Sequence, residues 1–436
     1  MTNKKTWLIS KIVFNVVAVL TVLINLVSFV CGEMEATITE YVFGGYEKEV
    51  EYSEDSVVFA SDYDSVANVK AAALNVANAA ESEGAVLLKN DDALPLAENS
   101  VVSLYSASSV NPLYAGGGGA IINTIKESDK IYFPTALEAA GLTYNEELYK
   151  WYKENDDIYG RKNATGNGTT ATIDEAPWSV IPTAAKTKSA DAGIFVLSRV
   201  GTEGKDLESS YLKLDSNEIS VLKGMKEEKS KGNLKKIIVL LNSANPINLD
   251  FIDNADYGID AVLWIGLPGT SGLYGVCDIL VGLVTPSGRL PDTWYIDNLY
   301  NPAVANYGNF KHDNTYVVYQ EGVYLGYRYA ETRYEDVVLK TANTGSFDYS
   351  SSVKYSFGFG KSYTEFSYGK FEKKYDEASD TYTFTVDVKN VGGVAGKEVV
   401  QVYLQQSYTE YDKINHIEKP SVELVGFAKP TNSTDG

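Results

Sequence analysis

The chain has 436 residues, which is enough for two or three domains that each bury a core. Its formal net charge of -20 would repel phosphate backbones and anionic lipid headgroups, so neither nucleic-acid binding nor peripheral membrane binding is expected. Two cysteines and two histidines are too few for a disulfide framework or a histidine-rich zinc site, and the sequence therefore predicts no metal and no cofactor.

The N-terminus predicts a membrane segment over residues 1–32. Lys4 and Lys5 precede an apolar run that continues from Ile12 to Val30, long enough to cross the hydrocarbon of a bilayer. A signal-peptide core is usually shorter and ends in an Ala-x-Ala-like site, which is not evident here, so the pattern favours an uncleaved signal anchor over a cleaved signal. The lysines place the remaining chain on the extracellular face, anchored by this helix, or secreted if it is cleaved. Residues 33–65 read as an acidic linker.

Residues 66–300 alternate between helical and strand patterns, which predicts a three-layer α/β sandwich with a mostly parallel sheet. A helix over 66–84 is followed by a short strand, and a second helix is expected from Pro134 to Ala140. Continuous apolar runs that end at Ser198, Leu241 and Ile265 are typical of strands covered on both faces. Between the first two of these runs, a helix over 215–229 is expected, with Asp215 or Ser216 as its N-cap.

The C-terminal third differs from the preceding residues in composition and in residue pattern. Residues 301–364 are rich in tyrosine and glycine, and we interpret them as a connecting region. Residues 365–436 show strict alternation at Tyr382, Phe384, Val386 and Val388, then a second alternating run after a Gly-Gly turn, which predicts an antiparallel β-sandwich. The sequence stops before a sandwich of seven strands could finish, so this domain is expected to be incomplete and the chain to be a fragment.

Several segments carry a family resemblance when they are taken together and in order. They are ESEGAVLLKNDDALPL (81–96), GIDAVLWIGLPG (258–269), PSGRLPDTW (286–294), YQEGVYLGYRYAETRY (319–334), YSFGFGKSYTEFSY (355–368) and VVQVYL (399–404). This series resembles glycoside hydrolase family 3, specifically its α/β sandwich domain and the fibronectin type III-like domain that accompanies it. The resemblance covers about residues 80–430 and implies a β-glucosidase-like enzyme whose catalytic barrel is absent from this chain.

The resemblance implies a catalytic carboxyl group in the segment SRVGTEGKDLE (198–208). Glu203 matches the acid/base of the family's Gly-x-Glu-Gly loop, and glycines beside it would let the loop approach a substrate. Glu175, Asp206 and Glu208 are rivals, because members of the family differ in where this acid sits. Lys205 and Asp206 are candidates for substrate binding, although they could equally shape the loop or pair with each other.

Other motifs are assigned structural roles or none. The glycine-rich loop 111–119 has no Gly-Lys-Ser/Thr after it, so nucleotide binding is not expected, and the loop is predicted to lie close to the partner barrel. Arg289 is expected to fix the PSGRLP corner. The family's Ser-Asp-Trp-like nucleophile segment and its Lys-His pair are not found, and the dipeptide Lys311-His312 is interpreted as chance. Tyr324, Tyr327 and Tyr329 either line a sugar-facing surface or pack against the sandwich.

The resemblance therefore implies part of an exported, retaining β-glycosidase that hydrolyses terminal β-linked sugars, with a β-linked oligosaccharide or glucoside as substrate. Glu203 would be the acid/base, and an aspartate of the missing barrel would be the nucleophile, so the fragment is predicted to be inactive alone. The alternative is a non-catalytic cell-surface module that binds carbohydrate or has a structural role.

Overall fold

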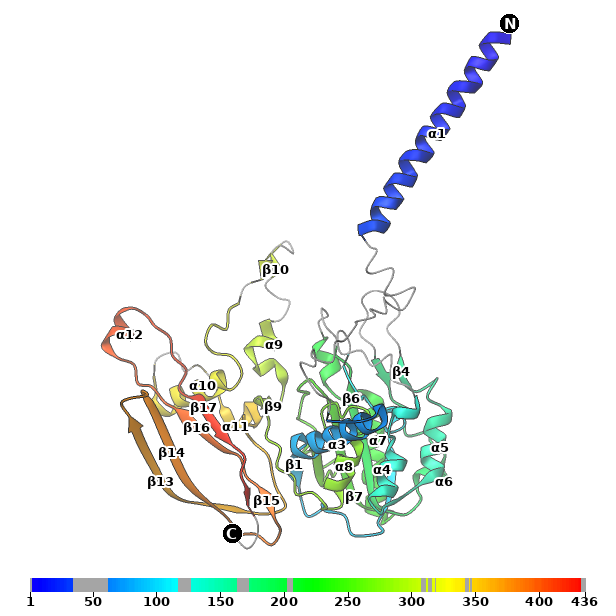
Figure 1. Cartoon of the computed structure of the whole chain (residues 1–436). Helices are drawn as coiled ribbons and strands as arrows, with labels where there is room; N and C mark the ends of the chain where they lie inside the picture. Colours follow the sequence, from blue (N-terminus) through cyan, green and yellow to red (C-terminus); the bar gives the residue numbers. More distant parts are fainter. Residues whose placement is uncertain are drawn as a thin grey trace. The chain divides into compact units, whose positions relative to one another are not determined.

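The computed structural model describes residues 2–33, 62–116, 127–162, 172–201, 207–306, 311–312, 316–317, 319–341, 345 and 347–432. The chain divides into one unit of residues 1–66 and a second of residues 67–436 (Figure 1). Each unit is described by itself. The predicted linker, residues 33–65, lies almost entirely outside the described residues.

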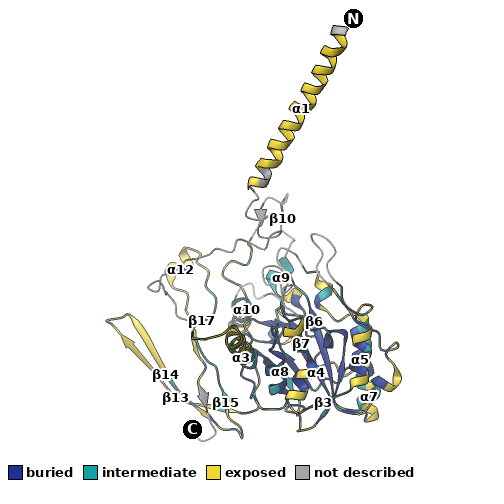
Figure 2. Ribbon diagram, turned by 45° about the vertical axis from the view of Figure 1, so that its right-hand side comes forward, coloured by how far each residue is buried: buried dark blue, intermediate teal, exposed yellow. Residues whose placement is uncertain are grey.

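The first unit contains helix α1 (Thr2–Glu33). Its segment Lys4–Phe29 is 26 residues long, apolar and unburied, which is sufficient by length and composition to cross a membrane (Figure 2). Signal sequences near an N-terminus have the same properties, so the choice between an anchor and a cleaved signal stays a prediction.

The second unit is built on a six-stranded sheet with the order β1-β8-β7-β6-β2-β3. Neighbouring strands from β8 to β3 are parallel, and only β1 is antiparallel to its neighbour. The predicted mixed α/β fold with a parallel-rich sheet is therefore confirmed. The strands are β1 (Val86–Asn90), β2 (Val101–Tyr105), β3 (Thr143–Tyr144), β6 (Ala190–Arg199), β7 (Leu234–Ser243) and β8 (Ala261–Trp264).

Helices cover both faces of this sheet. Along the sheet, the chain moves in one direction from β2 to β3 and in the opposite direction from β3 to β6 and from β6 to β7. Because such connections are right-handed, the helices of the first crossover lie on one face and those of the other two on the opposite face. Helix α4 accordingly packs with α8 and α8 with α3, whereas α5 and α6 pack together and α7 packs on β7. The bounds are α3 (Val66–Gly84), α4 (Phe133–Ala139), α5 (Glu146–Glu154), α6 (Thr183–Lys186), α7 (Ser216–Lys231) and α8 (Leu273–Leu280).

Local sequence explains where α7 begins and ends. The Asp215 side chain accepts hydrogen bonds from the N–H groups of Asn217 and Glu218, and the Glu218 carboxylate accepts from the Asp215 N–H in return. This capping box satisfies donors that have no partner inside the helix. Gly232 ends the helix with φ +83°, a left-handed conformation that glycine adopts without a Cβ penalty.

The core lies in the middle of the sheet. Strands β6 and β7 are buried along nearly their whole length, as Figure 2 shows, because each is an apolar run with helices over both faces. Cys277 is also fully buried, on α8, where it is a small residue of the core.

Residues 301–364 are more regular than the predicted connecting region. They contain α10 (Tyr327–Leu339), a helix of 13 residues, whose Ala330 is fully buried beside Tyr295 and Val353. The other elements around it are short. They are β9 (Trp294–Tyr295), η5 (Asn298–Tyr300), α9 (Pro302–Asn306), β10 (Lys311–His312), β11 (Tyr316–Val317), α11 (Tyr349–Ser352) and β12 (Val353–Tyr355), with β9 pairing β12.

After residue 365 the described chain forms antiparallel strand pairs. β13 (Phe366–Asp376) pairs β14 (Thr381–Asn390), β16 (Val400–Leu404) pairs β17 (Glu423–Ala428), and β15 (Gly396–Lys397) pairs β18 (Thr431–Asn432). Tyr382 and Phe384 belong to the alternation from which a β-sandwich was predicted, and both are exposed. The Tyr382 ring is tilted against that of Tyr375, and the Phe384 ring stacks on that of Phe371 of the partner strand. The fibronectin type III-like domain stays a prediction. The remaining short elements are α12 (Glu410–Ile414), β4 (Gly160–Lys162), β5 (Thr172–Asp174), η1 (Ala107–Ser109), η3 (Glu127–Asp129) and η4 (Ser209–Leu212).

Candidate functional site

The candidate site lies at the carboxyl ends of the parallel strands. Beyond β2 the chain crosses to β3 in one direction, and beyond β6 it crosses to β7 in the other. In open α/β sheets, such a reversal opens a crevice between the two strand ends, and ligands collect there. Val200 and Gly201, the described start of the loop that carries Glu203, follow β6 at this edge.

A single buried amide connects the loops at this edge. Asn242, near the end of β7, accepts from the Leu113 N–H (2.7 Å) and from the Ser198 hydroxyl (3.0 Å). Its Nδ2 donates to the carbonyls of Leu113 (3.0 Å) and Gly266 (2.8 Å). Asn242 thus holds the segments that follow β2 and β8 to the end of β6.

Glu203, Lys205 and Asp206 lie outside the described residues, because 202–206 are not described. The two ends of their loop are described, and Arg199 joins them. Its guanidinium donates to the carbonyls of Ser198 (2.8 Å), Tyr211 (2.5 Å) and Lys213 (2.6 Å). The same group makes two hydrogen bonds of 2.7 Å to the buried Glu218 carboxylate. The base of the loop is therefore fixed at both ends by one charged group.

Small residues bring a second loop against this base. A Cβ on Gly201 would lie 2.5 Å from Nδ2 of Asn245, so a larger residue here would have to displace that side chain of the loop after β7. A Cβ on Gly116 would lie 4.0 Å from the Gly201 carbonyl oxygen. The described part of the glycine-rich loop, 111–116, therefore ends beside Gly201. Its last predicted glycines, 117–119, lie outside the described residues.

Glu175, one of the rival acids, faces the interior. It is 3% exposed, and its oxygens accept from the N–H groups of Ala107 (2.9 Å) and Ala176 (2.8 Å). Burial raises the pKa of Glu175 to about 8, although both hydrogen bonds oppose that rise. A carboxyl group that supports two backbone segments and is shielded from solvent is unsuited to proton exchange with a substrate. Glu208, the other described rival, is exposed.

Two polar residues next to the glycine-rich loop, Asp156 and Arg161, were not predicted. Arg161 donates to the carbonyls of Asn111 (3.2 Å) and Pro112 (2.9 Å), and Asn111 donates to Asp156 (3.3 Å). Within the described chain, Nε of Arg161 and Oδ1 of Asp156 are buried without a hydrogen-bond partner. No motif in the sequence indicates this group, because it joins the glycine-rich loop to residues 156–161, which lie far from it in the sequence.

Arg289 has the structural role that was predicted for it. Its guanidinium donates to the Gly360 carbonyl and makes two hydrogen bonds, of 2.9 and 3.0 Å, to the Glu398 carboxylate. The PSGRLP corner is thereby joined to the strands after residue 365.

The predicted tyrosines are divided among different contacts. Tyr324 donates to Glu418, Tyr329 packs edge-on against Phe347, and Tyr327 lines a pocket with Tyr403. Packing against the C-terminal strands thus accounts for at least part of their role. Lys311 and His312 form a two-residue strand, β10, far along the chain from the loop of Glu203. Across the described ranges, no group of three or more His, Cys, Asp or Glu side chains could hold a metal ion.

The sequence of the chain matches a known protein family and several of its curated members. Residues 85–327 match the family model described as the glycosyl hydrolase family 3 C-terminal domain. The chain is 32% identical over 355 residues to a β-glucosidase of Ruminococcus albus, covering 80% of this chain and 33% of that protein. It is 29% identical over 359 residues to the thermostable β-glucosidase B of Acetivibrio thermocellus, covering 81% of this chain and 40% of that protein.

Solved structures show the same relationship. The β-glucosidase 3B of Thermotoga neapolitana, solved in complex with α-D-glucose, superposes with a TM-score of 0.67 at 28% identity, covering 83% of this chain and 47% of that one. A β-glucosidase of Paenibacillus barengoltzii gives a TM-score of 0.67 at 26% identity, covering 82% and 36%. The chain thus spans less than half the length of each of these proteins.

Proposed function

This chain belongs to glycoside hydrolase family 3, and from that premise we propose that it is part of an exported, retaining β-glucosidase whose acid/base is Glu203. The single observation that carries the proposal is the clamped loop base at the carboxyl edge of the sheet. Arg199 fixes both ends of the loop, and Gly201 allows it to approach Asn245 closely. A catalytic acid needs such a rigid base, because its proton must reach the glycosidic oxygen at hydrogen-bond distance.

The proposed reaction needs a second carboxylate. Retaining glycosidases use two carboxyl groups about 5 Å apart, one as nucleophile and one as acid and then base. Glu203 would protonate the leaving oxygen, then activate the water that hydrolyses the glycosyl intermediate. The nucleophile would be an aspartate of a catalytic barrel, and the Ser-Asp-Trp tripeptide does not occur in this chain. The glycine-rich loop beside Gly201 would face that barrel. Lys205 and Asp206 would contact the sugar hydroxyls.

We also propose the organisation of the chain around this function. Residues 66–300 would form the α/β domain, 301–364 the connection, and 365–436 part of a fibronectin type III-like domain. The apolar helix over 1–32 would export the protein and anchor it at the extracellular face, and the span Lys4–Phe29 supports this placement.

The test compares the purified 436-residue chain with the native gene product on a chromogenic β-glucoside. We expect no turnover by this chain alone and turnover by the native product. In the native product, Glu203→Gln should slow deglycosylation strongly, and azide should restore the rate because it needs no base to attack. Glu208→Gln, which removes an exposed carboxylate from the end of the same loop, is the matched control and should change little.

Two outcomes would contradict the proposal. Full activity of Glu203→Gln without azide would remove Glu203 from catalysis. No activity of the native product on any β-glycoside, combined with saturable sugar binding, would instead support the alternative, a carbohydrate-binding module at the cell surface.

A further inference from the structure

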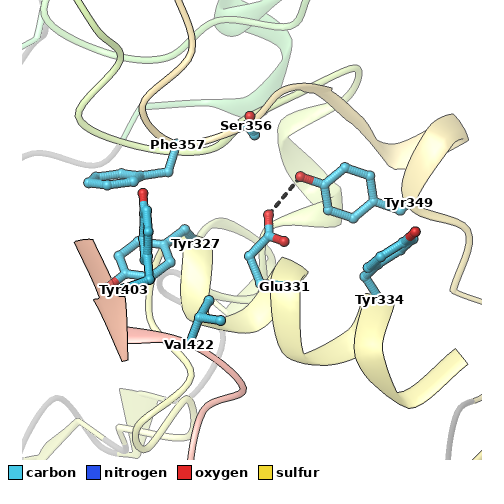
Figure 3. Close-up of a pocket in the computed structure, with 8 residues that line it drawn as sticks. All are labelled: Tyr327, Glu331, Tyr334, Tyr349, Ser356, Phe357, Tyr403 and Val422. Atoms are coloured by element: carbon cyan, nitrogen blue, oxygen red, sulfur yellow. Dashed lines mark hydrogen bonds between the residues drawn. The ribbon is translucent and has the colours of Figure 1, made fainter. Parts of the chain in front are cut away.

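An aromatic pocket lies outside the sheet, between helix α10, the segment that precedes and follows β12, and strand β16 (Figure 3). Its volume is about 560 Å³, within the range of sites for small organic ligands. The lining residues that matter for the argument are five rings and one carboxylate. They are Tyr327, Glu331, Tyr334, Tyr349, Phe357 and Tyr403.

The rings are held in place by contacts with one another. The Tyr327 ring lies 4.5 Å from that of Phe357 and 6.1 Å from that of Tyr403, which it meets edge-on. The Tyr327 hydroxyl also accepts a hydrogen bond of 2.8 Å from the Leu424 N–H of β17. This wall therefore joins α10 to the strand pair β16–β17 and is ordered before any ligand arrives.

The opposite wall holds the carboxylate. The rings of Tyr334 and Tyr349 lie 5.3 Å apart, and the Tyr349 hydroxyl donates a hydrogen bond of 2.7 Å to Oε1 of Glu331. Figure 3 shows Glu331 between this pair and the Tyr327 wall. Part of the pocket is open to solvent, since Tyr334 is 51% and Tyr403 38% exposed.

The charge of the pocket is one-sided. No residue that lines it carries a positive charge, so within the described chain the Glu331 carboxylate faces only neutral groups there. The hydroxyl protons of Tyr349 and Tyr403 are used inside the protein, the first by Glu331 and the second by Oε1 of Gln401 (2.5 Å). A ligand in the pocket would therefore meet a mainly negative electrostatic potential, which comes from a carboxylate and from the electron-rich faces of aromatic rings.

We propose that this pocket binds an organic cation of the alkylammonium class, with the charged nitrogen among the rings and beside Glu331. Aromatic rings attract such a cation through their quadrupoles, and a nearby carboxylate adds to the attraction. A neutral sugar carries no positive charge to pair with the Glu331 carboxylate, so it would gain less from this pocket than a cation does. The net charge of -20 further favours a cationic ligand. The proposal does not depend on the glycosidase activity proposed above.

The test is a titration of the full chain with choline, followed by calorimetry or by NMR of the ligand methyl groups. Neohexyl alcohol is the matched ligand control, because it has the shape of choline with carbon in place of the charged nitrogen. We expect choline to bind saturably, at least about tenfold more tightly than neohexyl alcohol, with an affinity that falls as salt is added. Glucose is titrated in parallel.

Glu331→Gln should weaken choline binding by about tenfold or more, because it keeps the shape of the side chain and removes its charge. Glu335→Gln is the matched control, since Glu335 lies one turn further along α10, outside this pocket, and accepts a hydrogen bond from Gln405. Equal binding of choline and neohexyl alcohol, saturable binding of glucose but not choline, equal effects of the two variants, or no binding by any ligand would each overturn the proposal.

Discussion

Removing the Arg199 side chain should destabilise the α/β unit more than any surface substitution. Arg199 and Glu218 are both nearly inaccessible to solvent, at 4% and 6% exposure of their side chains, and they meet through two hydrogen bonds of 2.7 Å. Arg199→Met leaves the Glu218 carboxylate buried without its counter-charge and frees three backbone carbonyls. Breaking a buried ion pair from one side costs about 3–5 kcal/mol, and we expect a loss of that size in the free energy of unfolding.

The measurement is guanidinium denaturation of the single variants Arg199→Met and Glu218→Met and of the double variant. The double variant leaves no isolated charge, so its loss should be at least about 2 kcal/mol smaller than the sum of the single losses. Lys213→Met is the control, because it removes a partly exposed ion pair with Asp297 and should cost below about 1 kcal/mol. Additivity within about 0.5 kcal/mol, or an Arg199→Met loss equal to that of Lys213→Met, would refute the reasoning.

Three further outcomes are expected. Gly224→Ala on α7 should lower the denaturation midpoint, because the added Cβ would overlap the Trp178 ring. The cost of overpacking, about 1–3 kcal/mol, exceeds the gain in helix propensity, about 1 kcal/mol. A higher midpoint would contradict this. Burial raises the pKa of Glu81 from 4.5 to about 8, so between these pH values the folded state keeps a proton that the unfolded state has lost. The free energy of unfolding should therefore fall as pH rises through this range. Glu81→Gln should flatten that fall, and an unchanged pH profile of the variant would contradict this. Gly201→Ala in the native gene product should lower kcat, because the added Cβ would collide with the Asn245 side chain and displace the loop of Glu203. The double variant with Asn245→Ala should recover part of the rate. If it recovers none, the contact with Asn245 is not the cause.

The central strands and α7 were predictable because their signals are local. β6 and β7 are continuous apolar runs, and the observed strands extend the expected ends at Ser198 and Leu241 by only one or two residues. Helix α7 is specified by Asp215 at its start and Gly232 at its end.

The direction of β1 and the helix α10 were not predictable for the opposite reason. An apolar run reads the same in a parallel and in an antiparallel strand, so nothing in 86–90 indicates that β1 runs against β8. Tyrosines favour strands by local propensity, yet in α10 the rings of Tyr327 and Tyr334 pack against residues distant in sequence, and this tertiary packing selects the helix.

The candidate site was predictable only as a position. The resemblance indicated the loop of Glu203, but not the group that holds it, because Arg199 and Glu218 are charged residues on different elements and look like ordinary surface residues in the sequence. Asn242 is similar: a single asparagine at a strand end carries no signal of the three segments it joins.

The exposed hairpin β13–β14 implies that this chain does not open as one cooperative block. A two-stranded hairpin is marginal in water, and its cross-strand aromatic pairs, such as Phe371 with Phe384, contribute only about 0.2–1 kcal/mol each. Among the described residues no second sheet covers these rings, whereas the central strands of the α/β sheet are buried on both faces. Residues 366–390 should therefore exchange their amide hydrogens and be cleaved by proteases while the α/β sheet is still folded. A single melting temperature would then report the unfolding of the sheet and not that of the hairpin.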